Sequence, residues 1–183
     1  MTTVAETDST EPAWRTRVVT WKAPVVDRAQ IAAMSGLDYL HYLLDSERTP
    51  PIAALLDFKL VRIEPGRAVF AGTPSEFHYN PIGAVHGGFA ATLLDSALGC
   101  SVHTTLKAGF AYTTIELKVN YVRPLQLTTG VVSCEGRVIH VGSRIATAEA
   151  RLTDAAGKLY AHGSTTCLIF PVDDVVKGSE RCP

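Results

Sequence analysis

The sequence predicts an α+β protein in which an antiparallel sheet wraps around one long central helix. After residue 57 the apolar residues change from a helical period to an alternating one, and only residues 86–105 return to a helical pattern. Four alternating segments separated by short turns follow this helix, which favours strands joined by hairpins. The length of 183 residues, with 46% hydrophobic and 19% charged residues, favours one globular domain.

The first 54 residues are expected to form a partly helical extension. A first helix is predicted at 28–34 with Asp27 as its N-cap, and a second at 37–44 that ends before the proline pair at 50 and 51. Residues 52–56 predict one more short helical turn. Trp14 and Trp21 lie in an otherwise polar arm, which suggests that part of the arm docks on another surface.

The sheet is expected to begin with a hairpin. It spans 57–73 and turns at Pro65-Gly66, and a loop with a helical turn follows at 74–83. After the central helix, four strands are predicted at 110–122, 127–140, 143–153 and 158–170, and a polar tail at 172–183.

Alternation within two of these strands gives their faces. In the first, Thr113 shares an apolar face with residues 115, 117, 119 and 121. In the third, Ala146, Ala148 and Ala150 recur at every second position. Side chains this small allow the central helix to approach the sheet closely.

The central helix contains one acid. Asp95 is the only Asp, Glu, Lys or Arg between residues 86 and 102, and apolar residues surround it. A helix that is apolar on nearly all sides is expected to be buried, and a buried carboxylate is usually paired, neutralised or used. Asp95 is therefore a candidate general base or nucleophile, with a structural capping role as the alternative.

A glycine pair, Gly87-Gly88, lies at the start of the same helix. The first amides of a helix have no partner within it and carry partial positive charge, and glycine lets a substrate approach the backbone closely. The Gly87 N–H could therefore stabilise an oxyanion. The alternative is a glycine pair that only allows a tight entry to the helix.

Composition excludes several other classes. A formal charge of −1 provides no overall basic field for nucleic acid or anionic lipid, and no run of about 18 apolar residues predicts a membrane span. The first ten residues lack the layout of a signal peptide. The four cysteines are scattered without a CxxC pair, so neither zinc nor any other metal site is expected, and a reducing cytoplasm is favoured.

Three sequence stretches together resemble a known family. They are NPIGAVHGG at 80–88 with Asp95 seven residues on, TTIELKVNYVRP at 113–124, and VGSR at 141–144. These motifs are similar to those of the PaaI-like, or phenylacetate-pathway-type, acyl-CoA thioesterases. The resemblance covers about 55–170 and implies a hotdog fold for a domain at 55–171.

The resemblance also implies an activity and a site. Members hydrolyse acyl-CoA to free acid and CoA, need no cofactor, and work as dimers or tetramers. By this resemblance Asp95 activates water or attacks the thioester, the Gly87 N–H binds the carbonyl oxygen, Asn80 positions substrate or water, and Thr113 assists near the carboxylate. Gly87 and Asn80 are expected from one subunit, and Asp95 and Thr113 from the other.

Four more residues are expected near the substrate. His86 and Gly88 flank the glycine that binds the carbonyl, and His86 is given a supporting role at the helix entry. Arg123 and Arg144 could bind CoA phosphates, because arginine suits bidentate phosphate contacts. The histidines at 78, 103, 140 and 162 show no metal-ligand spacing and are expected to be packed or exposed.

Two other functions remain as alternatives. A hotdog module could bind acyl-CoA without cleaving it, as a sensor would. A hotdog dehydratase would act on the acyl chain, but this chemistry calls for a different Asp/His pair, which the sequence lacks.

Overall fold

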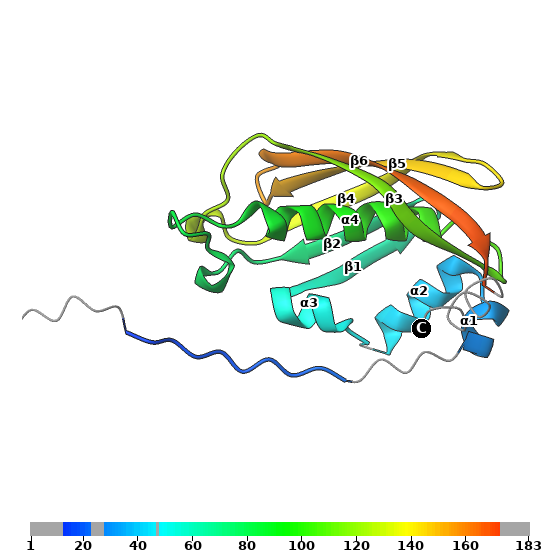
Figure 1. The fold of residues 1–183 in the computed structure, drawn as a ribbon, viewed down its shortest axis with the longest axis horizontal. Coiled ribbons are helices and arrows are strands. Elements are labelled where there is room, and N and C mark those ends of the chain that lie inside the picture. The colour runs from blue at the N-terminus through cyan, green and yellow to red at the C-terminus, as the bar shows by residue number, and fades with distance from the viewer. Residues whose placement is uncertain (1–12, 23–27, 47, 173–183) are drawn as a thin grey trace, which may run out of the picture.

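A six-stranded antiparallel sheet curls around one long helix, as predicted (Figure 1). The computed structural model describes residues 13–22, 28–46 and 48–172. The strand order is β1-β2-β4-β5-β6-β3, so β1 and β3 form the two edges. The strands are β1 (Phe58–Glu64), β2 (Arg67–Gly72), β3 (Phe110–Tyr121), β4 (Val132–Val141), β5 (Ile145–Asp154) and β6 (Leu159–Pro171).

The central helix α4 (Gly87–His103) lies against the concave face of the sheet. Leu93, Leu94 and Leu98 are fully buried there, as is the small Ala97. The backbone approaches the sheet so closely that a Cβ at Gly136 of β4 would lie 2.2 Å from the Ala97 carbonyl oxygen. The alanines predicted to allow this approach, at 146, 148 and 150, are all buried.

Three short helices precede the sheet, and the second and third of them lie beside β1 (Figure 1). They are α1 (Arg28–Ala33), α2 (Gly36–Asp45) and α3 (Pro51–Leu56), close to the predicted ranges. The Ser35 hydroxyl caps α2 by accepting from the Asp38 N–H, and Pro51 opens α3, where its missing N–H costs nothing. Asp27, the predicted cap of α1, lies outside the described residues.

The predicted strand at 127–140 begins later than expected. Residues Leu127–Thr129 form a 3₁₀ helix instead, and β4 starts at Val132. Gly130 between them has a φ of 71°, which ends the turn in a backbone conformation that glycine adopts readily. The helical turn expected in the loop at 74–83 is present at Glu76–His78.

Strand β3 contains a bulge that changes which side chains face the helix. Its pairing with β6 shifts between Thr114 and Glu116, so Ile115 is an extra residue. Leu117, Val119 and Tyr121 therefore keep the predicted face, but the alternation is reversed before the bulge. Thr113 is exposed on the outer face, and Thr114 takes the inner position.

No helix within the described residues is long and apolar enough to cross a membrane.

Candidate active site

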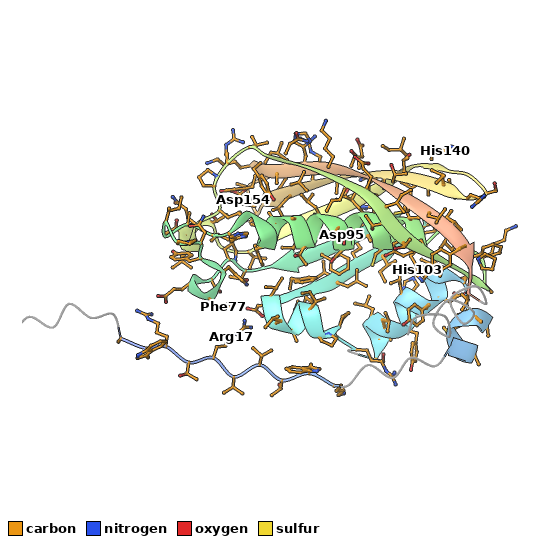
Figure 2. The ribbon with its side chains drawn as sticks, in the orientation of Figure 1. Arg17, Phe77, Asp95, His103, His140 and Asp154 are labelled. Atoms are coloured by element: carbon orange, nitrogen blue, oxygen red, sulfur yellow. The ribbon has the colours of Figure 1, made fainter. Side chains whose placement is uncertain are left out.

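Asp95 lies midway along α4 and is exposed in the single chain (Figure 2). The expectation of a buried carboxylate is wrong because the sheet is open. Its edge strands β1 and β3 do not meet, and the strip of α4 between them remains uncovered by strands. Asp95 lines a cavity of about 750 Å³ in this gap, together with residues from α2, α3, β1 and β3.

Thr114, not Thr113, contacts the carboxylate. Its hydroxyl donates a hydrogen bond of 3.0 Å to Asp95 Oδ1. Thr113 points to the opposite face of β3 because of the bulge after Thr114. Strict alternation could not reveal this, since a bulge leaves no clear trace in the apolar pattern. The only signal in the sequence was the pair of adjacent threonines, either of which could donate a hydrogen bond to the carboxylate.

Two other ionisable side chains near Asp95 stay neutral. Burial raises the pKa of the Cys100 thiol to about 12, and burial also raises the pKa of the Tyr112 phenol well above its usual value. Tyr112 packs so tightly on α4 that a Cβ at Gly99 would lie 2.5 Å from its hydroxyl oxygen. Both side chains line the same cavity as Asp95, and neither offers a charged nucleophile there.

Gly87 begins α4, and its N–H has no acceptor among the described residues. The neighbouring amide is occupied, because the Gly88 N–H donates to His86 Nδ1 at 2.8 Å. A Cβ at Gly88 would lie 2.8 Å from that nitrogen, so glycine is needed for the cap. His86 therefore caps α4 through Gly88, and it leaves the Gly87 N–H available.

Tyr121 is a residue at this end of the helix that the sequence did not single out. Its hydroxyl donates to the Gly87 carbonyl oxygen at 3.1 Å. Its ring lies 3.0 Å from the place where a Cβ of residue 87 would stand. Tyr121 thus contacts the first residue of α4 directly, and its inward position in the predicted alternation was the only signal for it.

Asn80 shapes the loop that leads into α4. Its side-chain oxygen accepts from the Ile82 and Ala84 N–H groups, each at 3.1 Å, and its own backbone N–H donates to the Ala84 carbonyl. This is the turn-forming behaviour that Asn often shows. Asn80 also lines a second cavity of about 510 Å³ together with His86, Gly87 and Tyr121.

The two candidate phosphate-binding arginines lie apart. Arg123 lines the second cavity, and its Nη1 donates to the Leu159 carbonyl at 2.6 Å. An adjoining cavity of about 350 Å³ joins Arg123 to Lys158. Arg144 is exposed in the turn between β4 and β5, and it lines none of these three cavities. A single chain therefore does not bring the two guanidinium groups to one place.

The predicted site residues thus form two groups at different positions on α4. Asp95 follows Gly87 by eight residues, which is about 12 Å along a helix and about 80° around it. Asp95 and Thr114 line the first cavity, whereas Asn80, His86 and Gly87 line the second. One substrate carbonyl cannot contact both the Asp95 carboxylate and the Gly87 N–H of the same chain.

No group of three His, Cys, Asp or Glu side chains in the described part of the chain could hold a metal ion. His78 is buried, where its Nε2–H donates to the Leu56 carbonyl at 2.9 Å. Burial lowers the pKa of His103 to about 4, and that ring packs against Tyr39 and Tyr112.

Residues 82–161 match the family model described as the thioesterase superfamily. Human acyl-coenzyme A thioesterase 13 is 32% identical over 108 residues, and the match covers 58% of this chain and 76% of that protein.

Solved structures of similar proteins have the same fold. A variant of the phenylacetic acid degradation protein PaaI from Thermus thermophilus is 29% identical with a TM-score of 0.59, over 65% of this chain and 98% of that one. A thioesterase family protein from Silicibacter pomeroyi has a TM-score of 0.65 at 24% identity, over 73% of this chain and 98% of that one. The predicted hotdog fold is thereby confirmed.

Proposed function

The chain belongs to the thioesterase superfamily and is a thioester hydrolase, and we propose that it cleaves acyl-CoA into a free acid and coenzyme A. The relative named as an acyl-coenzyme A thioesterase supports this substrate. The observation that carries the catalytic assignment is the Asp95 carboxylate, held by the Thr114 hydroxyl at the wall of a large cavity. The reaction needs water as its only co-reactant.

In this proposal the Asp95 carboxylate either activates water or attacks the thioester carbonyl. As a general base it would take a proton from water, which then adds to the thioester carbonyl, and as a nucleophile it would add to that carbonyl itself. In both forms the carbonyl oxygen gains negative charge, the C–S bond breaks, and CoA leaves as a thiolate that takes up a proton. In the nucleophile form the acyl group is then joined to Asp95 as an anhydride, and water hydrolyses this anhydride to the free acid and the carboxylate. The Thr114 hydrogen bond orients the carboxylate for either form, and Thr114 replaces Thr113 in this proposal.

The Gly87 N–H stabilises the charge that develops on the carbonyl oxygen. It is a backbone donor at the positive end of α4, and no described group occupies it. One donor of this kind contributes about 100- to 1,000-fold to kcat. Asn80 and Arg123 line the cavity beside Gly87, where we assign them to positioning the substrate and to its phosphates.

A second copy of the chain completes the proposed site. Asp95 of one copy would face Gly87 of the other, since the two groups of one chain are about 12 Å apart along α4. A symmetric dimer then has two equivalent sites, and a tetramer built from such dimers keeps them.

We place the catalytic domain at 55–171, between the extension at 1–54 and the tail at 172–183. Cytoplasmic location fits the free thiols at 100, 134 and 167.

Release of free thiol from acyl-CoA tests the substrate and the role of Asp95 together. Asp95→Asn should lower kcat at least about 100-fold, because the amide can neither accept the proton nor attack. Asp45→Asn, which changes an exposed acid at the end of α2, is the matched control and should keep full activity. Wild-type turnover in Asp95→Asn contradicts the proposal. Tight binding of acyl-CoA without thiol release favours the non-catalytic binding module.

The role of the Gly87 N–H has its own pair of variants. Gly87→Pro removes the donor, and proline is tolerated at the first helical position, where the extended backbone of His86 suits a following proline. Gly87→Ala adds a similar contact with the Tyr121 ring but keeps the N–H. Proline should lower kcat at least about tenfold more than alanine does. Equal losses in the two variants would assign the effect to crowding against Tyr121.

A further inference from the structure

The helices α2 and α3 form one side of the cavity at Asp95. They precede residues 82–161, the segment that matches the family model, so their role is not part of that match. They contribute Leu43 and Leu44 from α2 and Ile52 and Ala53 from α3. The other walls come from β1, β2, α4 and β3, and Asp95 of α4 and Thr114 of β3 lie on those walls.

The cavity is apolar away from the carboxylate. Its apolar lining includes Leu43, Leu44, Ile52, Ala53, Phe58 and Leu60. The basic side chains that line it, Arg48 and Lys59, are exposed. An apolar interior with a polar group at one place is typical of a site that binds a small organic group and orients its reacting end.

The N-terminal segment at 13–22 contacts α3 through Arg17 (Figure 2). Arg17 donates to the carbonyl oxygens of Leu55 at 2.8 Å and Ala54 at 3.4 Å, at the carbonyl end of α3, where cations are favoured. The same guanidinium lies 3.7 Å from the ring centre of Phe77. On another side, His78 donates to the Leu56 carbonyl. These contacts tie α3 to Arg17 of the N-terminal segment and to the 3₁₀ turn at Glu76–His78.

We propose that α2 and α3 build the acyl pocket of this enzyme, and that its substrates carry an uncharged, apolar acyl group of octanoyl size or larger. The inference rests on the proposed function, because it takes Asp95 as the carboxylate at which the thioester reacts. A volume of about 750 Å³ lies in the range of sites that enclose whole organic ligands. An acetyl group leaves most of this apolar surface in water, whereas each further methylene buried tightens binding roughly fourfold.

Chain-length profiles of kcat/KM test the pocket. The wild-type ratio of octanoyl-CoA to acetyl-CoA should be at least about 30. Ile52→Trp places bulk on the cavity side of α3 and should lower this ratio at least tenfold. Leu55→Trp is the matched control, because Leu55 is similarly exposed on the same helix but does not line the cavity. Leu44→Ala enlarges the pocket and should shift the optimum to longer chains.

Binding of stable analogues separates this inference from the proposed function. S-octyl-CoA and S-ethyl-CoA are thioethers that cannot be hydrolysed, and calorimetry gives their Kd values without any turnover. Tighter binding of S-octyl-CoA, lost in Ile52→Trp and kept in Leu55→Trp, supports the pocket even if Asp95→Asn remains active. The inference is overturned if the wild type shows no dependence on acyl length in either kcat/KM or Kd. It is also overturned if Ile52→Trp and Leu55→Trp have equal effects.

Discussion

At the scale of single residues, Tyr121 of β3 contacts the first residue of α4. Its hydroxyl donates to the Gly87 carbonyl and its ring contacts Gly87, which makes Tyr121 a candidate positioning residue for the proposed backbone donor. Tyr121→Phe keeps the ring and removes a hydrogen bond of about 1 kcal/mol. We expect kcat to fall about threefold to tenfold with KM nearly unchanged. Tyr42→Phe in α2 is the control, and an equal loss in both variants would contradict a specific role.

Thr114 orients the carboxylate through one hydrogen bond. Thr114→Val keeps the shape of the side chain but removes the donor, and hydrogen bonds to charged groups contribute about 1.5 to 3 kcal/mol. We predict a loss of at least about tenfold in kcat. Thr113→Val, on the outer face of the same strand, should change little, and steady-state kinetics compare the two. A larger loss at 113 would reverse the assignment.

The two threonines also show what the sequence can and cannot predict about the site. The positions of Asp95 and Gly87 follow from helix pattern and motif, because both lie on one regular element. The choice between Thr113 and Thr114 depends on a bulge, which is set by pairing with β6 and not by the local pattern. The exposure of Asp95 depends on the gap between the edge strands β1 and β3, and the local sequence pattern of α4 carries no information about that gap.

At the scale of elements, the C-terminal end of α4 is sensitive to pH. His103 is wedged between Tyr39 of α2 and Tyr112 of β3, with its Nδ1 unpaired among the described residues. Burial lowers its pKa to about 4, so it stays neutral when folded, and the unfolded chain binds its proton more strongly. The free energy of unfolding is therefore unaffected by His103 above about pH 6.5, and it falls as the pH is lowered from about 6.5 toward 4, because the unfolded chain takes up the proton first.

Urea unfolding at a series of pH values measures this effect. From pH 7 to about 4.5, the wild-type free energy of unfolding should lose about 2 to 3 kcal/mol through His103 alone. His103→Leu should remove that part of the pH dependence. His140→Leu changes an exposed histidine of β4 and should leave it. Identical pH slopes in wild type and His103→Leu would show that His103 does not destabilise the fold in acid.

The elements themselves were largely predictable from the sequence. Periodicity and turn residues gave the order of helices and strands, because amphipathic patterns depend on local geometry. The start of β4 was not predictable in this way. Residues 127–129 are compatible with a strand, but a 3₁₀ turn forms there, and Gly130 with its positive φ follows.

At the scale of the whole molecule, the open sheet supports the proposal that two chains share each active site. The edge strand β3 leaves Ile115, Leu117 and Tyr121 exposed, and unpaired strand edges favour association. Two copies related by a twofold axis could bring Asp95 of each near Gly87 of the other. This arrangement joins the acyl pocket of one copy to the Asn80 and Arg123 cavity of its partner.

Activity in mixed oligomers tests the shared site directly. Asp95→Asn and Gly87→Pro should each be nearly inactive alone, because every site then lacks one of its two groups. After subunit exchange, half of the dimers are mixed and each has one intact site, so thiol release should recover to about a quarter of the wild-type rate. A mixture that stays as inactive as its separate components, although exchange is confirmed, would contradict a site built from two chains.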